Sequence, residues 1–540
     1  MDTIGDLYEA YLLNKHDFPD APYFYGKIPR NYSEVVSEAI NLPSKKVDPE
    51  KMVKLKEILL GYHKKLGILT PKVKEHIEHL DEGVVITGQQ ATIFGGSGIV
   101  GNKIVSAVNV SKISEQKNRK LVPVFLVNTH DGIQPEISTI HLPNNQSSAS
   151  KPLNLDNITE GIVSKTILTD DFNWIEENLA IIKNIFSEFK SSIDKSSNKL
   201  FAENVEHIIT FLRETYRAST NIGDWVTLIW GIQANILNDW GVVFLPSSHE
   251  EIRKLTLEGY LPFLENRQKY IDEFNSATEK IRELGLNPTT ARKKNDYSPF
   301  FYECPNDGYR ITLSCQENEE NLTFTGECPI EKRNYSFTLK KDEFNLTSLS
   351  NILLPRLDTN HALLETILPV YVRISGPGEI NYNAQVIPAT RQIGLQFPIY
   401  VKYTRMLYNT PWIEKLTKES LNEAQSLFSQ EFFQTLGSIA KARRKRDKEQ
   451  LFEFSIRLCD IIISKMLHAK QINGKATEDF EKYKSWQFGM YDSNHQWQEV
   501  SFPWFIMASI TGLTDYLNSY KRYYSADSPV GGIGYINSRL

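Results

Sequence analysis

The sequence predicts an α/β protein whose core is a parallel β-sheet, with inserted helical and small antiparallel β subdomains and a helical C-terminal region. The first reason is a pair of short apolar stretches, 83–87 and 121–128, separated by a glycine-rich loop and a helical pattern at 99–113. Strand, loop, helix and strand in this order form a βαβ unit, whose strands are parallel and covered by helices. The second reason is the return of the same order at 368–403, where a Gly-Pro-Gly turn follows an apolar strand.

Before and between these units the chain is mainly helical. Residues 50–68 repeat apolar residues at a spacing near 3.6, so we expect residues 1–80 to be mostly helical. We also expect helices at 171–240, a buried strand at 241–248 and one long helix at 249–285.

The pattern changes in the last half of the chain. Residues 297–342 alternate around turn residues, which predicts a small antiparallel insertion. Beyond Pro411 the chain is predicted to be helical, with apolar stripes at 412–440 and 451–467 on either side of the basic run 441–448. We interpret this run as the solvated turn of a long helical hairpin. A nucleic-acid patch is the alternative, which the isolation of the run in an acidic chain disfavours.

The composition excludes several classes of protein. With 61 basic and 66 acidic residues, the net charge of -5 does not indicate a nucleic-acid or polybasic membrane protein. No apolar run approaches the roughly 18–20 residues of a membrane span, and the first residues lack the basic region of a secretory signal, so we expect a cytoplasmic protein.

Cysteine usage agrees with a reducing compartment. The four cysteines form no CxxC pair: Cys304, Cys315, Cys328 and Cys459. Three of them fall in the β-like region, but their spacing is loose and the nearest histidines lie well outside it. We therefore expect no bound metal.

The glycine-rich loop matches two phosphate-binding motifs incompletely. Residues 96–101 spell GxGxxG, but eight residues separate this run from Thr87 at the predicted strand end, and Asn128 stands where a ribose-binding acid is expected. A Walker A loop is rejected because no hydroxyl residue follows Lys103. Two interpretations remain open: a nucleotide site without a standard motif, in which 87–90 form an extended polar turn, or glycines that serve only tight packing.

Two segments resemble one known family. The stretch "HIEHLDEGVVITGQQATIFGG" and the helix after it resemble the hallmark of BshC, the cysteine-adding enzymes of bacillithiol biosynthesis, which carry "VVTGQQ.GLFGGP" and then a helix with a lysine. The matching positions are Thr87, Gly88, Gln89, Gln90, Phe94, Gly95, Gly96 and Lys103. The stretch at 376–385 is similar to the family's second signature at Gly376, Pro377, Gly378, Glu379, Ile380, Tyr382, Ala384 and Gln385. The resemblance covers roughly residues 50–405.

One block departs from the family pattern. Where the family usually has "SEDHDFAEI", this chain has "NTHDGIQPEI", so Gly132 stands at the position of the family's histidine and Asp131 is retained. The departure indicates a divergent member, or a paralogue with another substrate.

The resemblance implies a Rossmann-like core related to class I aminoacyl-tRNA synthetases, and a helical coiled-coil domain that forms a homodimer. We accordingly expect four regions. They are 1–140, the N-terminal helices and first half of the core; 141–345, the core continuation with helical and β insertions; 346–410, the second half of the core; and 411–540, a helical coiled-coil-like domain and tail.

The resemblance also implies a ligase that adds cysteine to glucosaminyl malate, driven by ATP, with magnesium, through an activated carboxyl. Charge develops when ATP meets a carboxylate, and cationic groups must stabilise it. We expect Lys103, with the amides of Gly95 and Gly96, to hold phosphates, and Arg373 to add a second positive charge. His130 and Asp131 are candidates for accepting the proton of the amine. Two of these residues also have a purely structural interpretation: His130 as a polar turn residue, and Arg373 as a surface arginine that pairs with a carboxylate.

The remaining candidates are ligand-binding groups. Glu379 opens a helix, where it also caps the dipole, and Tyr382 and Gln385 follow on nearly the same helix face. The full set of expected binding residues is Thr87, Gly88, Gln89, Gln90, Gly95, Gly96, Arg373, Gly376, Gly378, Glu379, Tyr382 and Gln385. Two rival functions stay open: a non-catalytic or re-purposed paralogue that binds a nucleotide or sugar, and an NAD-dependent oxidoreductase.

Overall fold

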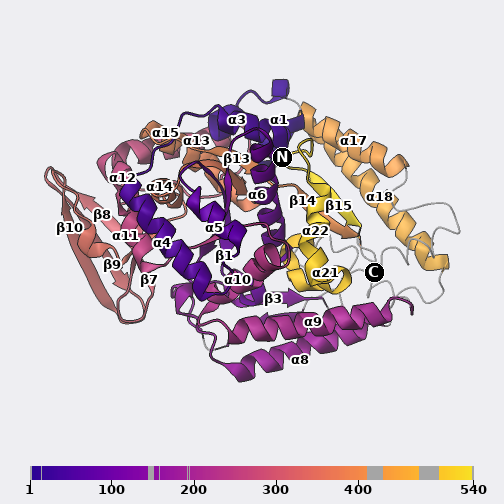
Figure 1. Cartoon of the computed structure of the whole chain (residues 1–540). Coiled ribbons are helices and arrows are strands. Elements are labelled where there is room, and N and C mark those ends of the chain that lie inside the picture. Colours follow the sequence, from indigo (N-terminus) through magenta and orange to yellow (C-terminus); the bar gives the residue numbers. More distant parts are fainter. Residues whose placement is uncertain are drawn as a thin grey trace.

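A computed structural model describes residues 3–409, apart from 14, 144–150, 157, 191, 192 and 194, together with residues 430–472 and 498–537. At its centre lies a five-stranded sheet with the order β13-β12-β1-β2-β5, in which all neighbouring strands are parallel (Figure 1). The strands are β1 (Val84–Gln90), β2 (Val122–Asn128), β5 (Val243–Pro246), β12 (Val370–Ser375) and β13 (Ile399–Lys402). The predicted α/β fold with a parallel core is confirmed.

Helices cover both faces of this sheet, because side chains alternate between the faces along each strand. In β1, Val84 and Ile86 face one layer and Val85 faces the other. The first layer consists of α4 (Pro49–Lys65), α5 (Pro71–Glu78), α11 (Glu250–Thr256) and α14 (Asn360–Glu365). The second layer includes α3 (Tyr32–Ile40), α6 (Gly98–Gln116) and α10 (Ile222–Gly231).

The order of the strands creates a switch point between β1 and β12. From β1 the chain crosses through α6 to β2 on one side, whereas from β12 it crosses through α15 (Pro377–Gln392) to β13 on the other side. In open α/β sheets, ligands bind outside the carboxyl ends of the strands at such a point.

Strand β1 extends further than the sequence predicts. The predicted polar turn at 87–90 is wrong, because Gly88 pairs with Leu126 and Gln90 pairs with Asn128 of β2. A Cβ atom at Gly88 would lie 2.7 Å from the carbonyl oxygen of Leu126, which explains the glycine. The two glutamines therefore stand on the end of a strand, where the sheet fixes their backbones.

The predicted long helix at 249–285 is broken into four pieces. They are α11, η6 (Leu257–Tyr260), α12 (Leu261–Glu265) and α13 (Arg267–Glu283). Pro262 stands in the first turn of α12, where its missing amide costs nothing, and Asn266 leaves the helical region before α13.

The antiparallel insertion is confirmed and projects from the body at the left of Figure 1. It contains two three-stranded sheets, in the orders β11-β6-β7 and β10-β9-β8. Their strands are β6 (Phe300–Glu303), β7 (Arg310–Thr312), β8 (Ser314–Glu317), β9 (Asn321–Cys328), β10 (Arg333–Lys340) and β11 (Leu353–Pro355).

The helical predictions for the inserted and C-terminal segments are confirmed within the described residues. The inserted pair is α8 (Phe172–Phe189) and α9 (Asn198–Arg217), at the bottom of Figure 1. The basic run ends α17 (Gln430–Lys445) and forms the turn into α18 (Lys448–Ile472), as predicted for a helical hairpin. The apolar stripe at 412–440 lies partly outside the described residues.

The last helices return to the core. Helices α21 (Trp504–Thr511) and α22 (Leu513–Tyr523) pack against α9 and α6, and β15 (Ile533–Asn537) pairs in parallel with β14 (Arg405–Asn409). At the other end of the chain, α1 (Ile4–Leu13) and α2 (Ala21–Tyr25) pack on α15. The short elements are η1 (Lys15–Asp17), η2 (Ile93–Gly95), α7 (Pro135–Ser138), β3 (Thr139–Leu142), β4 (Lys151–Asn154), η3 (Ser164–Thr166), η5 (Ile232–Ile236), η7 (Thr347–Leu349) and α20 (Gln498–Ser501).

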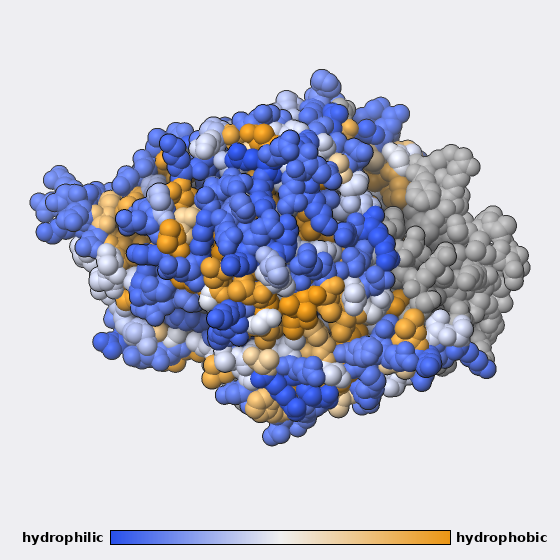
Figure 2. All heavy atoms as spheres, in the orientation of Figure 1, coloured by the Kyte–Doolittle hydropathy of each residue, from blue (hydrophilic) through white to orange (hydrophobic). Residues whose placement is uncertain are grey.

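The face drawn in Figure 2 is largely hydrophilic, with a hydrophobic band above the α8–α9 pair. Among the described residues, no helix combines the length and the apolar character that crossing a bilayer would require.

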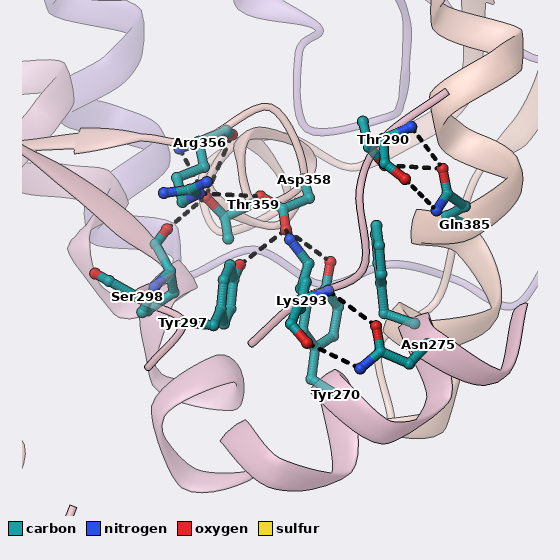
Figure 3. A network of polar contacts seen from close by, with 12 residues as sticks. Tyr270, Asn275, Thr290, Lys293, Tyr297, Ser298, Arg356, Asp358, Thr359 and Gln385 are labelled. Atoms are coloured by element: carbon teal, nitrogen blue, oxygen red, sulfur yellow. Dashed lines mark hydrogen bonds and ion pairs between the residues drawn. The ribbon is translucent and has the colours of Figure 1, made fainter. Parts of the chain in front are cut away.

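A buried ion pair joins the segment that follows α13 to the loop before α14 (Figure 3). The ammonium of Lys293 contacts the Asp358 carboxylate, which also accepts hydrogen bonds from Tyr270 (3.1 Å) and Tyr297 (2.9 Å). Burial alone would raise the pKa of Asp358, but Lys293 and Arg356 hold it down at about 2. The carboxylate is therefore charged and fully partnered.

We predict that Asp358→Leu lowers the free energy of unfolding by about 3–5 kcal/mol, because it leaves the Lys293 charge buried without its partner. The double variant Asp358→Leu with Lys293→Met removes both charges and is expected to recover a large part of this loss. Urea unfolding of the three proteins measures the difference. Equal losses in the single and double variants would contradict this account.

Candidate active site

Lys103 and Glu379 meet at the switch point between β1 and β12. The Lys103 side chain, from the second turn of α6, is only 3% exposed, and its ammonium contacts a carboxylate oxygen of Glu379 at 2.6 Å. It also donates to the carbonyl oxygen of Gly88 (2.9 Å) and to Oε1 of Gln89 (3.0 Å). An ammonium has three donors, and here each one has an acceptor. Lys103 thus links β1, α6 and α15.

Glu379 fixes the start of α15 as well. The carboxylate oxygen that contacts Lys103 also accepts a hydrogen bond from the backbone amide of Gly376 at 2.7 Å. A carboxylate in the first turn favourably opposes the positive end of the helix dipole. Space is open around Gly378, where an added Cβ would meet no atom within 4 Å. The beginning of α15 is therefore rigid and accessible.

The glycine loop packs against helices of the second layer. Phe94, Gly95 and Gly96 all have positive φ angles, of 56°, 79° and 77°. The amides of Gly95 and Gly96 already donate within the loop, to Thr92 and Ile93 (both 3.1 Å). The loop is buried and the amides of Gly95 and Gly96 are already bonded within it, so they do not face the Lys103 cluster. Their geometry fits the interpretation in which these glycines serve tight packing.

Two tryptophans hold this loop by its carbonyl groups. Trp230 of α10 donates its indole N–H to Gly95 (2.9 Å), and Trp504 of α21 donates its own to Phe94 (2.8 Å). A helix from the end of the chain therefore supports a loop near its beginning.

His130 and Asp131 follow β2 but differ in exposure. His130 is buried, with Nδ1 at 2.6 Å from the hydroxyl of Ser247, and burial lowers its pKa to about 4 although Asp131 opposes the shift. Its side chain lines a small cavity of about 20 Å³ with Arg253 and Leu245. Asp131 is 24% exposed and accepts a hydrogen bond from Arg310 at 2.9 Å. His130 is therefore a neutral, interior group, whereas Asp131 is reachable from outside.

Arg373 is a second cation of the site. It lies on β12 beside Ile86 and is half-buried, and in the described part of the chain its guanidinium makes no hydrogen bond and no ion pair within 4 Å, although its charge partly opposes the rise in the pKa of Glu365 that burial causes. Its charge acts on His361. Burial lowers the pKa of His361 to about 3, and the charge of Arg373 adds to this shift. An unpartnered, partly desolvated cation is a ready site for an anionic ligand group.

Tyr382 lies among the charges of the cluster, while Gln385 points away from them. Burial raises the pKa of Tyr382 above its usual range, Glu379 raises it further and Arg373 opposes the shift. Gln385 is fully buried and bonds Thr290 and Thr278, which ties α15 to α13 (Figure 3). Thr87 is also engaged, because its hydroxyl donates to the carbonyl oxygen of Ile374 on β12.

Three features of the site escaped the sequence analysis. Arg310 comes from the antiparallel insertion, 179 residues after Asp131, and carries no motif. Among the described residues, buried Oδ1 of Asn128 and Nε2 of His361 have no hydrogen-bond partner, which is uncommon in folded proteins and calls for an explanation. The position of Asn128 at a strand end was the only available signal.

These observations define the class: a Rossmann-like α/β protein with a cluster of charged side chains at the carboxyl edge of its sheet. The family model for "Bacillithiol biosynthesis BshC, N-terminal Rossmann-like domain" matches residues 3–403. The chain belongs to the BshC family.

Curated relatives carry the name "Putative cysteine ligase BshC". The chain is 24% identical to the protein of Staphylococcus epidermidis over 372 residues, which cover 68% of this chain and 63% of the relative. It is 25% identical to a protein of Bacillus cereus over 400 residues (73% and 67%) and 26% identical to one of Bacillus licheniformis over 407 residues (74% and 67%). The match thus spans about two thirds of each relative, and the chain is a divergent member.

The buried His130 predicts a pH-dependent stability. Its folded-state pKa of about 4 lies below the unfolded value of about 6.5, so its contribution is complete above pH 6.5 and is lost as the pH falls toward 4. Acid should therefore lower the free energy of unfolding of His130→Asn less than that of the wild type, by up to about 3 kcal/mol. Urea unfolding between pH 4.5 and 8 measures this slope.

Ser247→Ala is the matched control, because it removes the hydrogen-bond partner of His130 and keeps the imidazole. We expect it to lower stability at all pH values and to retain the wild-type slope. The interpretation fails if His130→Asn retains that slope as well.

Proposed function

We propose that this chain is a carbon–nitrogen ligase that adds cysteine, or a similar amino acid, to the amine of a small amino-sugar conjugate such as glucosaminyl malate. The proposal rests on membership of the BshC family and on the name that its relatives carry, cysteine ligase. The observation that carries it is the Lys103–Glu379 ion pair at the switch point of the sheet, together with Arg373 of β12, whose charge acts with that of Glu379 on Tyr382.

We propose ATP, with magnesium, as the source of energy. Forming an amide from a carboxylate requires an activated carboxyl, and negative charge builds up where the carboxylate meets the phosphates. Arg373 is available at once for one of these anions. Lys103 becomes available if an incoming phosphate replaces Glu379 among its three acceptors, and the amino end of α15, with Gly376 and Gly378, also favours an anion.

The amine of the acceptor enters as an ammonium ion and must lose a proton. Asp131 is the more exposed member of the His130–Asp131 pair, so we assign it the contact with the amine, with Arg310 fixing its orientation. Neutral, buried His130 positions the turn through Ser247. Gln89 and Gln90 offer amides to the polar groups of the substrates.

We predict that the protein binds Mg–ATP and that Arg373→Ala weakens this binding by about 10- to 100-fold, the effect of losing one charge-assisted hydrogen bond. Since Arg373 has no partner in the described chain, the melting temperature should change little. Calorimetric titration with ATP, ADP and NADH measures the affinities, and Arg292→Ala, at an exposed arginine remote in sequence from the strand ends, is the control.

The same proteins then test the reaction. Wild type, incubated with Mg–ATP, cysteine and glucosaminyl malate, should give the cysteinyl product by mass spectrometry, and Arg373→Ala should give it more slowly. Nucleotide binding without any product favours the re-purposed paralogue, for which the altered block around His130 is the specific observation. NADH binding alone favours the oxidoreductase, and no nucleotide binding at all contradicts the ATP-driven ligase.

We also propose that the chain forms a homodimer through its C-terminal helices. Helix α18 exposes Phe452 (70%) and Ile456 (47%), which stand one turn apart on one face. Helix α17, which precedes it in the chain, exposes Leu436. Apolar residues spaced in this way typically face a partner helix.

Phe452→Glu is expected to convert the dimer to a monomer, because it places a charge in an apolar interface. Light scattering with size-exclusion chromatography measures the mass. Phe172→Glu, at an exposed aromatic residue of α8, should leave the dimer intact. A monomeric wild type, or a Phe452→Glu protein that stays dimeric, would overturn this assignment.

A further inference from the structure

Two turns of the antiparallel insertion repeat one sequence pattern. The turn between β6 and β7 contains Cys304-Pro-Asn-Asp307, and the turn between β9 and β10 contains Cys328-Pro-Ile-Glu331. Each has a cysteine, then a proline, then a carboxylate three residues after the cysteine.

The two turns also share one backbone conformation. In the first, the amide of Gly308 donates to the carbonyl oxygen of Cys304 (2.8 Å), and in the second the amide of Lys332 donates to that of Cys328 (2.9 Å). Gly308 and Lys332 both have positive φ angles, of 73° and 56°. A lysine rarely adopts this conformation, so the second turn keeps its shape against the preference of its own residue.

The four side chains converge from the two turns on one point. Their sulfur and carboxylate oxygen atoms all lie within 4.8 Å of one another. The contacts cross between the turns: Cys304 lies 3.4 Å from a carboxylate oxygen of Glu331, and Cys328 lies 3.1 Å from one of Asp307. Both thiols are buried, whereas Glu331 is exposed, so the cluster is open to solvent on one side.

The donor set matches a zinc ion. Zinc takes four ligands in a tetrahedron, with bonds of about 2.3 Å to sulfur and about 2.0–2.2 Å to oxygen, which places neighbouring ligand atoms about 3.5 Å apart. The two crossed contacts, at 3.4 and 3.1 Å, are close to this separation. Thiolates favour zinc over the hard cations magnesium and calcium.

The surrounding groups orient both carboxylates. Asn306 and Tyr335 donate to the two oxygens of Glu331 (2.7 and 2.8 Å), and the amide of Tyr309 donates to Asp307 (2.8 Å). Such outer partners are typical of metal ligands. We propose that Cys304, Asp307, Cys328 and Glu331 form a structural zinc site that fastens the two hairpins together.

The sequence does not predict this metal site, because its cysteines and histidines show no regular ligand spacing. The two missing ligands are carboxylates, and the pairing of the two turns depends on the fold of the insertion. The first turn leads directly into Arg310, which reaches Asp131, so the zinc site would also steady one wall of the candidate active site.

The direct test is the zinc content of the full-length protein, purified from zinc-supplemented cells and measured by mass spectrometry of the elements. We expect about one zinc per chain in the wild type and at least a tenfold lower content in Cys304→Ser with Cys328→Ser. Cys315→Ser is the matched control, because this buried cysteine lies on β8 in the same insertion but outside the cluster. It should retain the metal.

A second measurement uses the wild type alone, so it does not depend on the folding of any variant. Removal of zinc with a chelator should lower the melting temperature, and Zn²⁺ but not Mg²⁺ should restore it. Co²⁺ added to the stripped protein should give the thiolate-to-cobalt charge-transfer band. The proposal is overturned if the wild type holds no zinc and shows neither response, or if the double serine variant keeps as much zinc as the wild type.

Discussion

The Lys103–Glu379 ion pair is the interaction on which the site depends. It joins an element that follows β1 to an element that follows β12, 276 residues later in the chain, at the place where the sheet changes direction. A buried ammonium without acceptors would cost several kcal/mol. The fold must therefore bring Gly88, Gln89 and Glu379 to the same point, and this requirement fixes the end of β1 against the start of α15.

The charged side chains fall into two groups: those whose hydrogen-bonding atoms are all engaged within the protein, and those that are open to further contacts. Lys103 has all its donors satisfied, and Lys293 and Asp358 are enclosed by tyrosines, so these charges stabilise particular contacts between elements. Within the described residues Arg373 makes no such contact, and Asp131 is half-buried beside Arg310. Both groups act on Tyr382: burial raises its pKa, Arg373 opposes the rise and Asp131 adds to it.

The sequence predicts those parts of the fold that depend on local pattern. Continuous apolar stretches identify β1, β2 and β12, and the glycine-rich segment between the first two locates α6 correctly. Gln89 and Gln90 were predicted to lie in a turn because two polar residues follow a glycine. They lie in a strand because they pair with Val127 and Asn128 of β2, and this pairing is not visible in the local sequence. Trp504, Arg310 and the crossed cysteine–carboxylate contacts were missed for the same reason: each depends on segments that meet only in the folded chain.

A double-mutant cycle on Lys103 and Glu379 tests the central claim most directly. The free energies of unfolding of Lys103→Met, Glu379→Gln and the double variant are compared with that of the wild type. If the ion pair joins the two halves of the core, the sum of the two single losses should exceed the loss in the double variant. We expect this difference, the coupling free energy, to be about 2 kcal/mol. Additive losses, to within about 0.5 kcal/mol, would show that the two side chains act independently and would contradict this account of the site.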